Sequence, residues 1–252
     1  MRTNVMRTLA TALFIVLATL CGTMDSAKAQ KSGKGLLVAG RAADINAGGR
    51  LYDNHWSIIE IEPPSTLNPL YPNKVQTPSL STWRCVTCHG WDYAGRKGHL
   101  KNTAGSETFR SLTNMVGRPP GEIVLKLKGS HQAIVAPLSI AQLRKLALFV
   151  SHGQYNVSLV MTPTGVAIGN ALYGKDIYGS ACVGCHGLKG LEPIMGETGD
   201  RSSLGWIARN RPQQAVHKIR NGVSKADMLS LRFLDLSSIG DLLAYLQSMD
   251  RK

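Results

Sequence analysis

The sequence predicts an all-α protein made of two similar halves, and three observations carry this prediction. Apolar residues recur at helical spacing over residues 138–150 and again over residues 236–249. A short cysteine–histidine pattern occurs twice, at residues 85–89 and 182–186. The elements expected around the second copy also have counterparts around the first. With 252 residues the chain has room for one or two compact domains.

The composition is that of a globular protein. Hydrophobic residues make up 43% and charged residues 18%, which argues against wholesale disorder. No uncharged run is long enough for a protein that crosses a membrane several times. The chain has 29 basic and 16 acidic residues, a net charge of +13, so an acidic partner is favoured.

Residues 1–29 have the layout of a secretory signal peptide, which predicts export to the periplasm. Arg2 and Arg7 precede an uncharged stretch from Thr8 to Met24, and Ala27-Lys28-Ala29 supplies the small residues of a cleavage site. The alternative is a retained membrane anchor, for which this 17-residue stretch is near the lower length limit. Cleavage leaves 26 basic and 15 acidic residues, a charge of +11, and removes Cys21.

The repeated pattern is C-x-x-C-H, the signature of covalent haem attachment in c-type cytochromes. Two intervening residues let one turn of backbone present both thiols to the vinyl groups at one porphyrin edge. The histidine that follows is then carried under the ring, where its imidazole can bind iron. The sequence therefore predicts two covalent haem c groups, attached through Cys85, Cys88, Cys182 and Cys185, with His89 and His186 as proximal iron ligands.

Three other interpretations of the cysteines were weighed. A four-cysteine zinc site usually spaces its two pairs by 15 to 20 residues or so, far less than the separation here. A thioredoxin-like redox pair needs a βαβ context, which the sequence lacks. Structural disulfides suit an exported protein but give no reason for a histidine after each pair.

Around the second pattern the sequence resembles a small class I-type cytochrome c domain, over about residues 165 to 250. Gly169–Tyr173 runs into Cys182 as the first helix of such domains does. Arg211–Gly222 is similar to their middle helix, which ends at a glycine. Leu236–Met249 corresponds to their closing helix, with Ser237 as a candidate N-cap.

The first half repeats this plan with additions. Gly48–Tyr52 matches Gly169–Tyr173, and a proline-rich insertion then precedes Cys85. Glu122–Lys128 is the expected middle helix, ending at Gly129, and Leu138–Val150 is the expected closing helix.

The resemblance implies two tandem cytochrome c-like domains, each around one haem c. The predicted boundaries are residues 30–152 for the first domain, 153–164 for a linker and 165–252 for the second domain. The aromatic-rich segment Trp83–Tyr93 is also similar to segments of bacterial dihaem cytochromes.

The distal iron ligands are expected to differ between the two sites. Met228 lies 42 residues beyond His186, just before the closing helix, where such domains keep their axial methionine. His131 lies 42 residues beyond His89, at the corresponding place in the first half. Methionine ligation raises the potential of a haem, so the first haem should be the lower-potential site and feed the second. Weaker candidates are Met195 and Met249 in the second half and His99, His152 and Met115 in the first, where a five-coordinate iron is the remaining alternative.

The predicted function is periplasmic electron transfer, as a free shuttle or as the cytochrome subunit of an oxidoreductase. The expected partners are redox proteins with an acidic docking face, with peripheral contact to a membrane-bound redox complex and no nucleic acid. No catalytic residue is assigned. Two alternatives stay open: a dihaem enzyme of the thiosulfate-oxidising or peroxidase type, and a haem-based sensor, both of which need an open or unusual coordination position.

Overall fold

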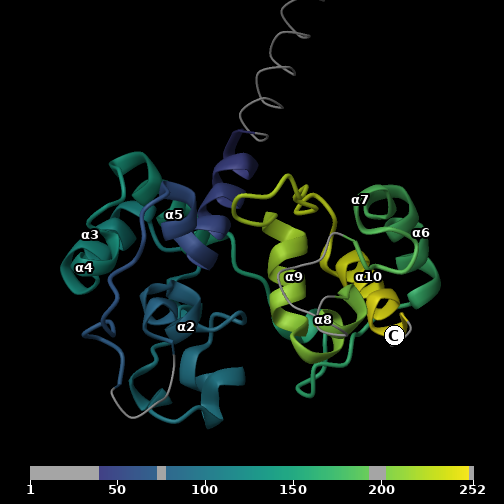
Figure 1. Cartoon of the computed structure of the whole chain (residues 1–252), viewed down its shortest axis with the longest axis horizontal. Coiled ribbons are helices and arrows are strands. Elements are labelled where there is room, and N and C mark those ends of the chain that lie inside the picture. The colour runs from purple at the N-terminus through teal and green to yellow at the C-terminus, as the bar shows by residue number, and fades with distance from the viewer. Residues whose placement is uncertain (1–39, 73–77, 193–202, 250–252) are drawn as a thin grey trace, which may run out of the picture. The chain divides into compact units, whose positions relative to one another are not determined.

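The structure is a computed structural model that describes residues 40–72, 78–192 and 203–249 (Figure 1). The chain divides into the units Met1–Ala43 and Asp44–Lys252, and the fold below is that of the second unit. Its described residues form helices and irregular segments, with one isolated bridge between Met161 and Ala167 and no strand. The all-α prediction is confirmed. The predicted signal peptide and Met195 lie outside the described residues.

The first half, defined as residues 44–152, begins in a helix over residues 40–59. The described part of the proline-rich insertion, residues 60–72, contains no helix. Four α-helices follow: α2 (Cys85–His89), α3 (Pro120–Ser130), α4 (Gln132–Val135) and α5 (Ile140–His152). Short 3-10 helices fill much of the remaining chain: η1 (Ser79–Trp83), η2 (Gly95–Lys97), η3 (His99–Asn102), η4 (Ser106–Thr108) and η5 (Thr113–Met115).

The second half, defined as residues 165–249, contains the five helices drawn in green to yellow in Figure 1. They are α6 (Ala171–Ala181), α7 (Val183–His186), α8 (Leu204–Asn210), α9 (Pro212–Asn221) and α10 (Leu236–Ser248). Between the halves, residues 153–164 include η6 (Val157–Leu159) and the buried side chains of Tyr155, Val160 and Met161.

Side-chain caps explain where the closing helices begin. The Ser139 hydroxyl accepts the Gln142 N–H, and the Gln142 side chain accepts the Ser139 N–H, so α5 starts with a capping box. In α10 the cap is Asp235, whose carboxylate accepts the Ser238 N–H at 2.8 Å. The predicted cap, Ser237, instead donates its hydroxyl to Asp235.

In each half a glycine lies where the first helix packs closely against the closing helix. A Cβ on Gly174 of α6 would collide with the backbone carbonyl of Asp241 in α10. A Cβ on Gly48 would collide in the same way with the carbonyl of Lys145 in α5. Glycine is required at both positions because only a missing side chain lets the two backbones approach this closely.

These contacts show which residues of the two halves correspond to one another. The correspondence differs from the one predicted from the sequence. Gly48 corresponds to Gly174 rather than to Gly169, because Lys145 and Asp241 are each the sixth residue of their helix. The same shift of five residues makes Tyr52 the counterpart of Tyr178. The predicted pairing of Gly48–Tyr52 with Gly169–Tyr173 is therefore wrong in register, since apolar spacing alone does not reveal which glycine lies at the helix crossing.

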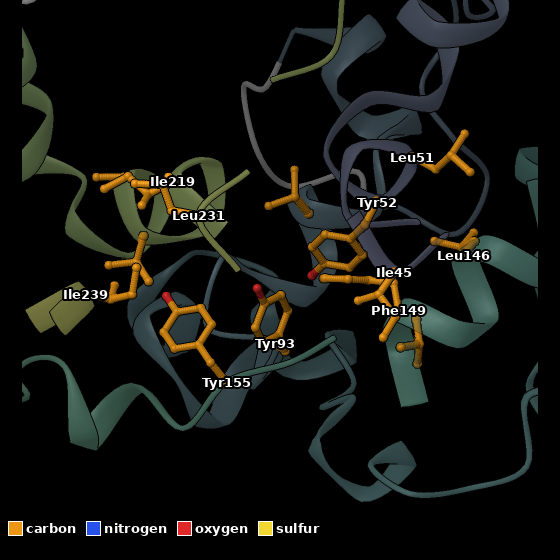
Figure 2. Packing of buried hydrophobic residues seen from close by; sticks show 14 of the residues in the cluster. Ile45, Leu51, Tyr52, Tyr93, Leu146, Phe149, Tyr155, Ile219, Leu231 and Ile239 are labelled. Carbon is orange, nitrogen blue, oxygen red and sulfur yellow. The ribbon is translucent and has the colours of Figure 1, made fainter. Parts of the chain in front are cut away.

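The core of this unit is continuous from one half to the other. Figure 2 shows Tyr52, Tyr93, Phe149 and Tyr155 as part of one cluster of buried residues that also includes Ile219 of α9. The ring of Tyr93 lies 5.7 Å from that of Phe149 and 5.6 Å from that of Tyr155, edge to face in both pairs. The rings of Tyr93 and Phe149 also lie 6.0 and 5.6 Å from that of His217 in α9, so ring packing contributes to holding the halves together.

Replacing Gly174 with alanine is expected to destabilise the protein by about 1–3 kcal/mol, because α6 and α10 must move apart to make room for the Cβ. Gly179 provides a matched control in the same helix, since it is exposed and its Cβ would meet nothing within 4 Å. Gly179→Ala should stabilise the helix by up to about 1 kcal/mol. Denaturant unfolding measures both effects, and equal stabilities of the two variants would contradict the close-approach argument.

Candidate haem-binding sites

Both C-x-x-C-H patterns fold as a single helical turn, as the spacing predicts. Cys85–His89 is α2, and Val183–His186 is α7 with Cys182 as its N-cap. A glycine in the left-handed region ends each turn, Gly90 with φ of 77° and Gly187 with φ of 67°. Within a helical turn the second cysteine and the histidine both lie on the face of the first cysteine, so each turn presents its two thiols and its imidazole together.

The imidazole rings of His89 and His186 are oriented in the same way. Nδ1 of His89 lies 2.7 Å from the carbonyl oxygen of Arg110, and Nδ1 of His186 lies 2.7 Å from that of Glu192. A carbonyl can only accept, so Nδ1 carries the proton in both rings and donates it. Nε2 of each ring then keeps its lone pair, which is the state that a metal-binding histidine needs.

The surroundings of His89 keep its ring neutral. Its pKa is lowered from 6.5 to about 4, mainly by burial and also by the neighbouring His131, against the opposing effect of the Arg110 carbonyl. A neutral imidazole is the form that binds iron.

In each half a tyrosine hydroxyl bonds to the backbone at the end of the C-x-x-C-H turn. The Tyr52 hydroxyl donates to the Gly90 carbonyl at 2.6 Å, and the Tyr178 hydroxyl donates to the Gly187 carbonyl at 2.5 Å. Each accepting glycine directly follows the proximal histidine. Burial raises the pKa of both tyrosines, that of Tyr178 to about 12, so both hydroxyls keep their protons. Sequence reasoning missed this pair, because Tyr178 lies four residues before its cysteine whereas Tyr52 lies 33 residues before.

The four cysteines of the two patterns are free thiols. Burial raises the pKa of Cys85 to about 12 and that of Cys88 to about 11, and it raises that of Cys182 as well. Within the described ranges no three histidine, cysteine or acidic side chains gather as a metal cluster. The two cysteine pairs therefore do not come together as one four-cysteine zinc site, nor are they disulfides in this structure.

His131 lies opposite the proximal histidine of the first half. It occupies the break between α3 and α4, and its ring centroid is 5.9 Å from that of His89 with 39° between the ring planes. Its Nδ1 is 2.7 Å from the Ser130 hydroxyl, so this hydrogen bond uses Nδ1 and does not involve Nε2. Burial lowers the pKa of His131 below its usual value. The structure thus brings the two predicted ligands of the first iron close together.

The other candidates in the first half have different surroundings. His99 pairs through Nδ1 with the Asp92 carboxylate at 3.1 Å. His152 is the exposed last residue of α5. Met115 ends η5 and packs against the hydrophobic core.

In the second half Met228 lies in the loop between α9 and α10, as predicted. Its side chain is half-buried against the hydrophobic core. The alternative, Met249, is buried at the end of α10, where its sulfur lies close to Gly190.

His217 is a buried polar residue that sequence reasoning did not single out. It lies in α9 with no exposed surface, and its Nε2 is 3.0 Å from the Gly49 carbonyl, to which it donates. Its Nδ1 accordingly accepts the Tyr93 hydroxyl at 2.9 Å. The ring also stacks obliquely on Trp91, with centroids 5.0 Å apart. The only signal in the sequence is a histidine within an amphipathic helix, which is a weak one.

Comparison with known proteins covers the second half. Residues 169–246 match the family model of the cytochrome c oxidase, cbb3-type, subunit III. No curated protein and no solved structure matches the chain. In the part of the chain that the structure describes, no helix is both long and apolar enough to cross a bilayer. Residues 169–246 are therefore a c-type cytochrome domain, which implies a covalently bound haem c and a general role in haem-based electron transfer.

Proposed function

We propose that the chain is a dihaem electron-transfer cytochrome of the periplasm, with one haem c in each half. The observation that carries the proposal is the recurrence of one set of contacts around both C-x-x-C-H turns. In each half the proximal histidine donates Nδ1–H to a carbonyl, and a buried tyrosine bonds to the glycine after it. The first half therefore has the same means of orienting an iron ligand as the half that matches a cytochrome family.

The proposed ligands of the second haem are His186 and Met228, with attachment through Cys182 and Cys185. Leu188 and Leu229, neighbours of the two ligands in sequence, are 84% and 70% exposed in the protein alone. Apolar side chains as exposed as these are suited to contact a porphyrin, which supplies the apolar surface that a small domain lacks.

The proposed ligands of the first haem are His89 and His131, with attachment through Cys85 and Cys88. Two imidazoles on opposite sides of one metal ion have their nitrogens about 4 Å apart, because each bond is about 2 Å long. Adding roughly 1 Å from each nitrogen to its ring centroid gives about 6 Å between centroids, and the observed separation is 5.9 Å. This agreement supports His131 as the distal ligand.

A bound haem c supplies an iron that accepts and releases one electron, and the protein residues set its potential. Methionine on one iron and histidine on the other predicts unequal potentials, with the first haem lower. We propose that electrons enter at the first haem and leave through the second. Two protein ligands on each iron favour outer-sphere electron transfer over the enzyme and sensor alternatives, which need an accessible coordination position.

The first half also carries the basic surface expected for an acidic redox partner. Its exposed basic residues follow the haem-attachment turn or lie in α3 and α5: Arg96, Lys97, Lys101, Arg110, Arg118, Lys126, Lys128 and Arg144. Arg110 supplies the carbonyl that orients His89, so basic charge lies beside the proposed first haem. Such a field would steer an acidic electron donor to that site.

Single replacement of the distal ligands tests this assignment. His131→Ala should convert the first haem to a high-spin form that binds carbon monoxide and should change its potential. Met228→Ala should do the same at the second haem and lower its potential, because methionine ligation raises it. Absorption spectra and potentiometric titration give both results, with His152→Ala as a control that removes an exposed histidine.

The proposal is refuted if the two potentials of the unmodified protein are indistinguishable and His131→Ala leaves them unchanged. Ready binding of carbon monoxide by the unmodified protein would instead favour a catalytic or sensing haem.

A further inference from the structure

We propose that the first half of the chain positions the distal methionine of the second haem. The Met228 loop, defined as residues 222–235, connects α9 to α10 within the second half. Its contacts with the first half nevertheless lie on both sides of Met228, at Ser224 and Lys225 before it and at Arg232 after it. The inference rests on the proposed role of Met228 as an iron ligand and adds the residues that hold it in place.

The first arm of the Met228 loop lies on the helix over residues 40–59. The Ser224 hydroxyl donates to the Arg50 carbonyl at 3.1 Å. The Lys225 ammonium group lies 3.3 Å from the Glu60 carboxylate at the end of the same helix. This ion pair is exposed and contributes little free energy by itself. Together with the Ser224 bond, it shows that the arm lies against this helix.

Gly222 lets the first arm of the Met228 loop fold so that its start lies close to the Met228 backbone. Its φ is 80°, in the left-handed region, and a Cβ there would lie 2.7 Å from the Met228 carbonyl oxygen. The same Cβ would lie 3.3 Å from the guanidinium of Arg50. The backbone of Met228 therefore packs against a turn that itself touches the first half.

The second arm is joined to the first half by one guanidinium group, that of Arg232. Its Nε donates to the Asn46 side-chain oxygen at 2.7 Å, and its Nη1 donates to the Gly153 carbonyl at 3.0 Å. Its Nη2 donates to the side chain of Asn221, at the end of α9. One side chain thus joins α9, the first helix of the other half and the end of α5, and bonds to a charged donor are stronger than neutral ones.

The Met228 loop also has anchors within its own half: the Gly222 N–H on the first arm donates to the Lys218 carbonyl at 2.7 Å, and two further bonds lie on the second arm. Leu231 N–H donates to the Ile219 carbonyl at 2.8 Å, and the Ser230 hydroxyl donates to the Arg220 carbonyl at 2.6 Å. Fixing a loop residue costs conformational entropy of about 1–2 kcal/mol, so a ligand is retained only where contacts on both arms offset that cost. Because the first half supplies contacts to both arms, it limits how far Met228 can move away from an iron.

The helix over residues 40–59 therefore supports both proposed haem sites. Asn46 and Arg50 within this helix and Glu60 directly after it contact the Met228 loop, while Tyr52 of the same helix bonds to the Gly90 carbonyl next to His89. The sixth ligand of the second haem is thus held by the element that anchors the first haem-attachment turn. Loosening the contacts between helix and loop should weaken methionine ligation without removing the haem.

A double-mutant cycle in the full-length, haem-loaded protein tests this inference. The variants are Arg232→Ala, Asn46→Ala and the combination, with Arg209→Ala as the matched control. Arg209 is also in the second half, but among the described residues its guanidinium donates to the Gln247 and Met249 carbonyls of that same half. The measurements are the charge-transfer band of methionine-ligated ferric haem, the affinity of the ferric protein for added imidazole, and the potential of the second haem.

We expect Arg232→Ala to bind imidazole at the second haem about tenfold more tightly, because a loosened Met228 competes less well for the iron. The charge-transfer band and the potential should fall in the same variant. Asn46→Ala should shift all three readouts in the same direction, and the double variant should do little more than Arg232→Ala, since both remove one bond. Arg209→Ala should behave like the unmodified protein.

Met228→Ala separates the failure of this inference from that of the proposed function. If Met228→Ala alters the band but Arg232→Ala and Asn46→Ala do not, Met228 is a ligand that the first half does not position, and the inference is overturned. If Met228→Ala alters nothing, the ligand assignment itself is wrong. Should Arg232→Ala fail to fold, Asn46→Ala and Ser224→Ala decide the question, and unchanged imidazole affinity in both would refute it.

Discussion

A chain in which Cys85 and Cys88 are both alanine is expected to carry one covalent haem, one fewer than we propose for the unmodified protein. The thioether bonds of the first haem need these thiols, and no other described cysteine lies in the first half. Mass spectrometry of the purified protein measures the loss directly. The chain with Cys182 and Cys185 replaced should lose the other haem, so that the two double variants have nearly the same mass and different spectra.

The remaining haem in each double variant identifies its site. With Cys85 and Cys88 replaced, the spectrum should be that of the methionine-ligated haem alone, and the lower potential should disappear. The affected half should also unfold more readily, because a domain of about 100 residues buries little apolar surface without its porphyrin. A mature unmodified protein with the added mass of only one haem would show that the dihaem proposal is wrong.

Replacing His217 with alanine is expected to lower the free energy of unfolding by about 3–5 kcal/mol, the largest effect we expect from a residue outside the haem ligands. The change opens a cavity in the core and leaves two buried groups, the Tyr93 hydroxyl and the Gly49 carbonyl, without their partner. The total stability of a domain is only about 5–15 kcal/mol, so the variant should unfold at much lower denaturant concentration.

His152→Ala is the matched control for this measurement. It also removes one histidine, and therefore one potential iron ligand of the unfolded chain, but His152 is exposed at the end of α5. The His152 variant should unfold within about 0.5 kcal/mol of the unmodified protein. Equal stabilities of the two variants would mean that the bonds of His217 do not hold the halves together.

The stability should also depend on pH in a way that His217→Ala reduces. Burial lowers the pKa of His217 from 6.5 to about 4, with Lys218 and Arg232 acting in the same direction and Asp53 opposing them. Between these two values the unfolded chain binds a proton that the folded protein does not, so stability falls as the pH falls from 6.5 to about 4. His55, whose pKa burial also lowers to about 4, keeps part of this dependence in the variant.

Several features of the fold and the sites were predictable because their signals are local. Apolar spacing placed α5 and α10, and the resemblance and the repeat placed α9 and α3, within a few residues of their observed bounds. The two haem-attachment turns follow from five consecutive residues each, and the match over residues 169–246 agrees with the domain expected there. Counting 42 residues from His89 made His131 a candidate ligand, because equal spacing in two repeats is visible in the chain itself, and the structure places its ring near that of His89.

Long-range contacts carry no such local signal. Gly48 and Gly174 look like other helical glycines until the helices that cross them are known, and that crossing, not the apolar pattern, sets the register between the halves. The carbonyls of Arg110 and Glu192 orient the proximal histidines although any residue type could supply them, because each is a backbone group.

The contacts between the halves likewise have no local signal in the sequence. The sequence distinguishes neither His217 from an ordinary helix histidine nor Arg232 from a surface arginine. Their partners are Gly49 and Asn46, 168 and 186 residues away along the chain. The amino-acid order thus specifies each helix and each C-x-x-C-H turn through its neighbours, whereas the contacts between the halves arise only when packing brings distant backbone and side-chain groups within hydrogen-bond distance.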